Sequence, residues 1–176
     1  MFHSTRLTLL LTVCLVLHSL GWAGGPPCPP RVDLARFQGC WYEVARAPNV
    51  FQRRCQLTTA EYRLLPNGQL QVINRCQTCR GRCKSLKGRA CTTNPPCNNR
   101  LIVSFPVPFG QLPKRLGRAN YFIHYVSPNY DTAVVGTPQR GLFWVLSRDR
   151  QLCPAELQRL LGIARRCGYD TSMLVM

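Results

Sequence analysis

Short runs of apolar residues separated by turn residues dominate the chain from residue 40 onward. Runs of this length that are rich in Val, Ile, Tyr and Phe predict β-strands rather than helices. Pro66-Asn67-Gly68 and Pro138-Gln139-Arg140-Gly141 lie between neighbouring runs and predict hairpin turns. The expected strands span residues 40–47, 57–65, 69–76, 84–92, 99–105, 119–127, 131–137 and 142–148.

Helical periodicity follows the last of these runs. Pro154 suits a first helical turn, and Gly168 suits the position just beyond a last turn that holds Arg165 and Arg166. Apolar residues recur between them at i, i+3, i+4 and i+7, namely Leu157, Leu160, Leu161 and Ala164. This single apolar stripe predicts a helix that packs against the outside of the sheet. A short helical turn is also expected over residues 33–37.

Eight strands and one trailing helix predict an all-β fold, an eight-stranded antiparallel up-and-down β-barrel with one C-terminal α-helix packed outside. Eight is the smallest common strand number that leaves room for one small ligand. Gly39 directly precedes the first expected strand, Trp41 lies near its start, and Arg148 ends the last. An arginine can lie over an indole ring and still donate hydrogen bonds to carbonyls. We therefore expect these three residues to plug one end of the barrel.

The N-terminal residues differ from the rest of the chain. Arg6 precedes the short apolar run 7–20 and small residues that suit a cleavage site, which predicts a secretory signal peptide over residues 1–23. A Pro/Gly-rich leader, 24–31, follows, and the length of 32–176 suits a single domain. No later segment has the roughly 18 uninterrupted apolar residues of a membrane span. We expect a secreted, extracellular protein that is soluble or peripheral to membranes.

The charge balance is strongly basic. The chain carries 23 basic and seven acidic residues, a formal net charge of +16. This balance favours acidic glycans or anionic membrane surfaces as partners, while a basic surface without a partner is the simpler interpretation. No helix-turn-helix, zinc-finger or RNA-recognition motif accompanies the charge, so nucleic acid is not an expected partner. The oligomeric state is left open.

Three motifs together resemble a known family. Gly39-x-Trp41-Tyr42 starts the first expected strand, Thr59-Ala60-Glu61-Tyr62 lies in the second, and Trp144-Val145-Leu146-Ser147-Arg148 ends the last. They resemble the lipocalins, in particular the branch that contains apolipoprotein D and the bacterial outer-membrane lipocalins. The family's acidic-tyrosine signature is present as Asn129-Tyr130-Asp131, with Asn129 in place of the usual acid. The resemblance implies a carrier that holds a fatty acid, sterol, retinoid or similar lipid inside its barrel.

The plug sets the register of the first and last strands. If Trp41 and Arg148 meet inside the closed end, the two-residue strand period turns every second side chain of both strands inward. The resemblance adds Tyr62, a position that lines the pocket in relatives. Alternation alone does not assign an inward face to 119–127. The expected ligand-binding interior, for which ordinary core packing is the alternative, comprises Glu43, Ala45, Tyr62, Trp144 and Leu146.

The chain is rich in cysteine, with eleven in all, of which Cys14 lies in the expected signal peptide. The others in a secreted chain predict up to five disulfides. A structural zinc site is conceivable in the crowded group 76–97, but secretion favours disulfides, so no metal is expected. Resemblance to relatives that tie the second strand to the C-terminal segment implies the pair Cys55 and Cys167. The cysteines whose pairing is not readable are Cys28, Cys40, Cys76, Cys79, Cys83, Cys91, Cys97 and Cys153.

Catalytic patterns are scarce. His124 is the one histidine outside the expected signal peptide, and no nucleophile elbow, metal-ligand run or phosphate-cradling glycine loop occurs. We expect a binding protein with no cofactor and no catalytic residues. Two alternatives stay open, a lipocalin-fold enzyme acting on a lipophilic substrate and a basic surface module. Arg53 and Arg54, in the loop after the first expected strand, either meet a ligand carboxylate at the mouth or remain solvated.

Overall fold

The structure is a computed structural model that describes residues 30–106 and 117–176. The expected signal peptide, 1–23, most of the expected leader, 24–31, and Cys28 lie outside the described residues. In the part of the chain that is described, no helix combines the length and the apolar character needed to cross a bilayer.

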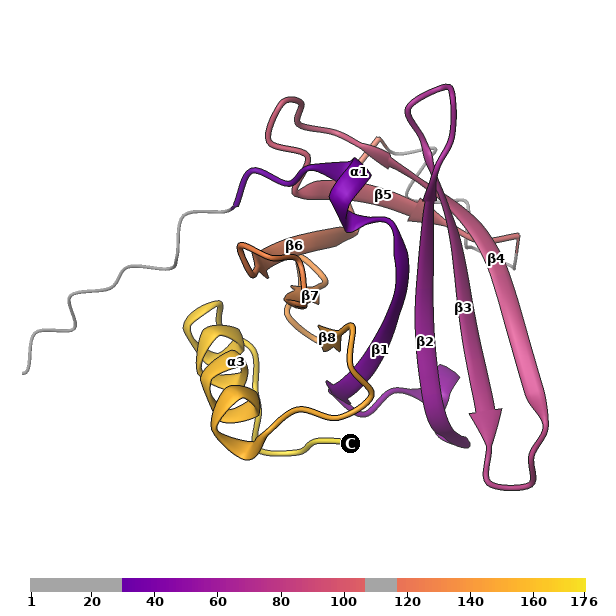
Figure 1. Cartoon of the computed structure of the whole chain (residues 1–176), viewed down its shortest axis with the longest axis vertical. Helices are drawn as coiled ribbons and strands as arrows, with labels where there is room; N and C mark the ends of the chain where they lie inside the picture. Colours follow the sequence, from indigo (N-terminus) through magenta and orange to yellow (C-terminus); the bar gives the residue numbers. More distant parts are fainter. Residues whose placement is uncertain (1–29, 107–116) are drawn as a thin grey trace, which may run out of the picture.

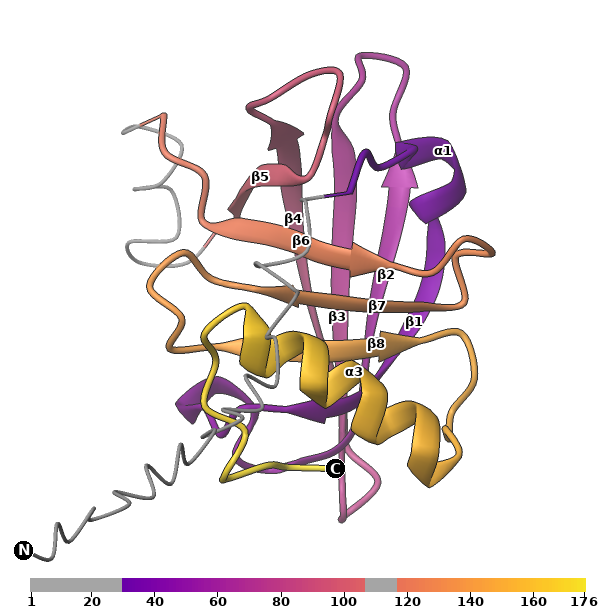
Figure 2. The ribbon, with the colours of Figure 1, turned by 90° about the vertical axis from the view of Figure 1, so that its left-hand side faces the viewer.

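Eight antiparallel strands close into a barrel in which each strand pairs with its neighbour in sequence and β1 pairs with β8 (Figures 1 and 2). The fold class expected from the apolar pattern is confirmed, and the ends of each strand differ from the expected ends by one or two residues at most. The strands are β1 (Gly39–Arg46), β2 (Cys55–Leu64), β3 (Leu70–Thr78), β4 (Cys83–Thr92), β5 (Arg100–Ser104), β6 (Tyr121–Val126), β7 (Thr132–Gly136) and β8 (Phe143–Ser147).

In the described ranges, three helical segments accompany the barrel: α1 (Leu34–Phe37), the 3-10 turn η1 (Val50–Gln52) and α3 (Pro154–Arg166). The Asp33 side chain caps α1 by accepting from the amides of the first turn. The Asn49 side chain caps η1 in the same way, by accepting from Gln52 N. The predicted C-terminal helix is confirmed as α3, which lies across the outside of β7 and β8 (Figure 2).

Two apolar cores follow from the alternation of side chains along the strands. On β7, Ala133 and Val135 belong to the core inside the barrel, whereas Val134 belongs to the core between the barrel and α3. On β8, Leu146 points inward and Val145 outward in the same manner. Both faces of these two strands are therefore buried, which explains their continuous apolar runs.

A β-bulge in β1 changes which side chains face inward. The pairing of β1 with β8 shifts between Glu43 and Ala45, so one extra residue is inserted at this point. Ala45 is fully buried beneath α3, in the outer core, so its expected place in the barrel interior is wrong. Arg46 pairs with the inward-facing Trp144 of β8. Because paired residues on neighbouring strands share a face of the sheet, Arg46 occupies the interior position expected for Ala45.

A second bulge explains why alternation assigned no inward face to residues 119–127. The pairing of β6 with β7 shifts between Ile123 and Tyr125. Tyr121 and Ile123 contribute to the interior core, whereas Tyr125 packs against the outer core. Neither set of alternate residues therefore faces inward along the whole strand.

The two ends of the barrel are built differently (Figure 1). At one end α1 lies beside the turn that joins β2 and β3. At the other end the loop that carries η1 joins β1 to β2, and the β3–β4 hairpin projects past the neighbouring strands. The first end is called the closed end below, and the second end is called the mouth.

Candidate functional site

Arg148, directly after β8, covers the barrel at the closed end. Its guanidinium carbon lies 3.7 Å from the centroid of the Trp41 ring, which is a cation–π distance. The Trp41 indole donates a hydrogen bond of 2.9 Å to the carbonyl oxygen of Phe37, the last residue of α1. Trp41 and Phe37 are both fully buried, so this end of the barrel is packed rather than open.

The same guanidinium holds the chain that connects α1 to β1. It donates hydrogen bonds of 3.2, 2.7, 2.8 and 3.2 Å to the main-chain oxygens of Arg36, Gln38, Cys40 and Tyr130. Gly39 lies within this connection at a φ of +95°, and a Cβ there would lie 3.1 Å from Arg148 Nη1. Glycine is required both for the backbone conformation and for the close approach of Arg148.

Tyr130 joins the β6–β7 loop to α1. Its hydroxyl accepts a hydrogen bond of 2.8 Å from Asp33 N, and the Arg36 guanidinium lies 4.2 Å from its ring centroid. The loop that carries Asn129 instead of an acid thus still contacts α1 through the neighbouring tyrosine. These contacts and those of Arg148 converge on the same end of the barrel.

Aromatic side chains from three strands meet inside the barrel. The hydroxyls of Tyr62 on β2 and Tyr121 on β6 are 2.8 Å apart, and burial raises the pKa of both groups, so they remain protonated at neutral pH. The Tyr121 ring stacks with the Trp144 ring of β8, with centroids 6.4 Å apart. Leu146, also on β8, packs in the same core. The interior is therefore mainly apolar, with one internally satisfied pair of hydroxyls.

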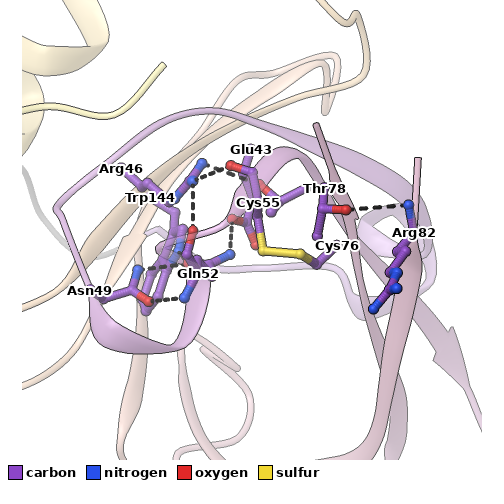
Figure 3. Close-up of a disulfide and its surroundings, with 10 residues drawn as sticks. Glu43, Arg46, Asn49, Gln52, Cys55, Cys76, Thr78, Arg82 and Trp144 are labelled. Carbon is purple, nitrogen blue, oxygen red and sulfur yellow. Dashed lines mark hydrogen bonds between the residues drawn. A yellow bond between two sulfur atoms is a disulfide. The ribbon is translucent and has the colours of Figure 1, made fainter. Parts of the chain in front are cut away.

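A polar layer lies between this interior and the mouth, and Gln52 of η1 is at its centre (Figure 3). Gln52 Nε2 donates to Glu43 Oε2 at 2.5 Å. Gln52 Oε1 accepts from Trp144 Nε1 at 3.1 Å and from Asn49 Nδ2 at 2.7 Å. The Gln52 side chain therefore connects the mouth loop to both β1 and β8.

Arg46 adds a positive charge to this layer and is only 2% exposed. It donates to Thr58 Oγ1 at 3.4 Å and to the carbonyl oxygens of Gln52 and Cys55 at 3.4 and 3.2 Å. Burial raises the pKa of Glu43, and hydrogen bonds from Thr58 and Gln52 and the charge of Arg46 oppose that rise. The layer can therefore offer a carboxyl group and a guanidinium to the polar end of a bound molecule.

A pocket of about 510 Å³ opens at the mouth, beside η1 and the adjoining ends of β2, β3 and β4. Its lining combines apolar side chains, basic side chains and no acidic side chain. Val50 and Phe51 are 72% and 85% exposed there. The lining residues are Val50, Phe51, Arg53, Arg54, Cys55, Cys76, Thr78 and Lys84.

The disulfide at the mouth corrects the expected pairing of Cys55 with Cys167. The structure joins Cys55 to Cys76, whose Cα atoms are 5.3 Å apart (Figure 3). These two cysteines lie on the adjacent strands β2 and β3, where the ladder pairs Thr58 with Cys76. Cys167 follows α3 and is buried in the outer core as a free thiol. Neighbouring strands therefore bring Cys76, not Cys167, within bonding reach of Cys55.

The other cysteines expected in disulfides do not pair in the part of the chain that is described. Apart from Cys28, which lies outside that part, the free thiols are those of Cys40, Cys79, Cys83, Cys91, Cys97, Cys153 and Cys167. Among the described residues, no three side chains of His, Cys, Asp or Glu gather in a group that could hold a metal ion.

His124 lies outside the barrel, where it supports the end of α3. Its Nε2 is 2.8 Å from the hydroxyl of Tyr169, which donates to the carbonyl oxygen of Thr137 at 2.9 Å. Burial and the charge of Arg140 lower the pKa of His124. These contacts join the chain after α3 to β6 and to the end of β7.

The family model of the lipocalin-like domain matches residues 32–176, which span the whole barrel and α3. The chain belongs to the lipocalin family. The outer membrane lipoprotein Blc of Escherichia coli K12 is 33% identical over 157 residues, which cover 85% of this lipocalin and 84% of Blc. Apolipoprotein D of Mus musculus is 26% identical over 175 residues, which cover 97% of this chain and 89% of that protein. The resemblance seen in the sequence motifs is thereby confirmed.

Solved structures agree on the fold. The cockroach allergen Per a 4 superposes on this lipocalin with a TM-score of 0.59. The match covers 80% of this chain and 84% of the allergen at 17% sequence identity. At that identity the likeness supports the β-barrel architecture alone.

Three residues of the lipocalin interior and its polar layer are not predictable from the strand pattern: Arg46, Gln52 and Tyr121. Arg46 is missed because the bulge reverses the alternation that placed Ala45 inward. Gln52 lies in a loop, where no strand period applies, but the Asn49-x-x-Gln52 spacing is a capping pattern that points to a turn at this position. Tyr121 is missed because the inward face of its strand could not be assigned.

Proposed function

We propose that this lipocalin is a secreted carrier that holds one small hydrophobic molecule inside its barrel. The observation that carries the proposal is the interior formed by Tyr62, Tyr121, Trp144 and Leu146, which is closed at one end by Arg148 and Trp41. Apolar burial supplies most of the affinity in such sites, and a few polar groups set the orientation of the ligand. Fatty acids, sterols and retinoids have the matching chemistry.

The polar layer supplies the orienting groups. Glu43 and Arg46 can accept from or donate to the polar end of the ligand, while Gln52 separates the interior from the mouth. We propose that a ligand entering from the mouth displaces a hydrogen bond of Gln52, whose amide then exchanges a bond to the barrel wall for one to water.

Secretion is supported by the pattern of residues 1–23 and by the Cys55–Cys76 disulfide, because disulfides persist in oxidising compartments. The relative Blc is named as an outer membrane lipoprotein, a location outside the cytoplasm. His124 has a structural position, because its contacts tie the chain after α3 to the barrel. This position agrees with a binding role rather than a catalytic one.

Tryptophan fluorescence tests the carrier function. Once residues 1–23 are removed, Trp41 and Trp144 are the remaining tryptophans, one under Arg148 and one in the interior wall. We expect saturable quenching by at least one fatty acid, sterol or retinoid, and loss of that quenching in Trp144→Phe. Trp41→Phe is the matched variant and should keep the quenching. Absence of saturable quenching by all three ligand classes in the wild-type protein would overturn the proposal.

A further inference from the structure

The mouth presents apolar side chains to solvent. Val50 and Phe51 are adjacent in η1 and are 72% and 85% exposed. The Gln52 side chain of the same short turn occupies the inside, where its hydrogen bonds to Glu43 and Trp144 fix the loop. The turn therefore holds Val50 and Phe51 outward, because its inward position is already filled.

Basic side chains surround these apolar residues. Arg53, Arg54 and Lys84 line the same pocket as Val50 and Phe51. The turn of the projecting β3–β4 hairpin adds exposed Arg80 and Arg82.

Few acidic residues lie close to this charge in sequence. Residues 44–60 and 74–92, which include the mouth loop, the first part of β2 and the β3–β4 hairpin, contain no Asp or Glu. The two flanking carboxyl groups have other partners, Glu43 with Gln52 and Glu61 with Arg75. The ion pairs among the described residues join Arg75 to Glu61 and Arg159 to Glu156, so neither involves a basic side chain of the pocket.

We propose that the mouth of this protein docks on an anionic phospholipid bilayer. Phe51 and Val50 enter the interfacial region of the bilayer, and Arg53, Arg54 and Lys84 bind headgroup phosphates. Exposed aromatic and aliphatic side chains ringed by basic residues match the layered chemistry of that surface. Acidic glycans would satisfy the charges but would leave Phe51 in water, so the exposed turn favours a lipid surface. The inference goes beyond the carrier function, because docking needs no ligand in the barrel.

Vesicle cosedimentation tests this docking surface. We expect the protein to bind phosphatidylcholine vesicles that contain phosphatidylglycerol, to bind pure phosphatidylcholine poorly, and to be released by salt. Arg53→Gln combined with Arg54→Gln should weaken binding by about 25-fold, since each basic residue near an anionic surface contributes about fivefold. The matched control is Arg63→Gln combined with Arg150→Gln, which removes the same charge from exposed positions near the closed end and should leave most of the binding intact.

The apolar contact is tested separately. Phe51→Ser should weaken vesicle binding about tenfold or more, and Phe51→Trp should retain binding and show a blue shift of its fluorescence only with phosphatidylglycerol vesicles. Unchanged vesicle binding in Phe51→Ser would overturn the proposal. So would retention on heparin without binding to vesicles, a result that would assign the basic surface to acidic glycans. The quenching assay for the barrel ligand uses no vesicles, so the two proposals fail or hold independently.

Discussion

Arg148 lies over the indole ring of Trp41, with 3.7 Å between the guanidinium carbon and the ring centroid, and joins the last strand of the barrel to the first. The two residues are more than a hundred positions apart in the chain. The contact therefore reinforces the closure of β8 on β1 at one end of the barrel. Because the same guanidinium also holds the α1–β1 connection, its removal should affect stability more than a surface arginine would.

Replacement of Arg148 by alanine should lower the free energy of unfolding by about 3 kcal/mol, through loss of the cation–π contact and several hydrogen bonds. Urea unfolding measures this change. Arg148→Lys should be intermediate, because an ammonium group keeps the charge but not the planar fork. Arg150→Ala, at an exposed neighbouring position, should change stability by no more than about 0.5 kcal/mol. Equal effects at positions 148 and 150 would contradict the structural role of the plug.

Gly39→Ala should destabilise the barrel by about 2 kcal/mol, since its φ of +95° is unfavourable for a residue with a Cβ and the new methyl group would crowd Arg148 Nη1. Thermal unfolding measures the loss. Gly141→Ala is the matched control, because its φ is ordinary and no atom lies within 4 Å of the added Cβ. That control should be neutral or slightly stabilising.

The strand positions could be predicted from sequence because short apolar runs alternate with turn residues along the chain, and the helix could be predicted from the helical period after Pro154. Side-chain direction was predictable only as far as each strand stays regular. A bulge inserts a residue without any signal in an apolar pattern, so regular alternation predicts Ala45 inward where the structure has Arg46. On β6 the bulge between Ile123 and Tyr125 reverses the alternation in the same way, so no single set of alternate residues faces inward along that strand.

The candidate site depends on contacts between segments that are distant in sequence, which local sequence patterns do not predict. The position of Gln52 follows from a loop that folds back onto β1 and β8, and these contacts exist only after the barrel closes. Cysteine pairing is equally non-local, because spacing along the chain does not tell which strands become neighbours. Cys55 pairs with Cys76 since β2 and β3 form one hairpin, and Cys167 remains beneath α3.

The Cys55–Cys76 pairing predicts a specific linked peptide. Alkylation of the unreduced protein, followed by proteolysis and mass spectrometry, should recover Cys55 bonded to Cys76, and Cys167 should be alkylated only after unfolding because it is buried. A peptide that links Cys55 to Cys167 would contradict the pairing.

Removal of this disulfide should also lower stability. The bond closes a loop with a sequence separation of 21 residues, for which the loss of chain entropy in the unfolded state corresponds to about 3 kcal/mol. Cys55→Ser combined with Cys76→Ser should show a loss of that size in urea unfolding under non-reducing conditions. Cys153→Ser, at an exposed free cysteine, is the matched control and should have little effect.

The carboxyl group of Glu43 should make stability fall as pH rises. Burial raises its pKa in the folded protein above the ordinary value of 4.5, so the folded state favours the protonated form. Its contribution to stability is fully present below pH 4.5 and is lost as pH rises through the raised pKa. Each pKa unit by which folding raises the pKa corresponds to about 1.4 kcal/mol.

The variant Glu43→Gln tests this dependence, because it keeps an oxygen that can accept from Gln52 Nε2 but does not ionise. The wild-type protein should therefore lose stability relative to Glu43→Gln between pH 4.5 and pH 7 in urea unfolding at constant ionic strength. A difference that is constant with pH, or that changes in the opposite direction, would show that the folded barrel does not raise this pKa.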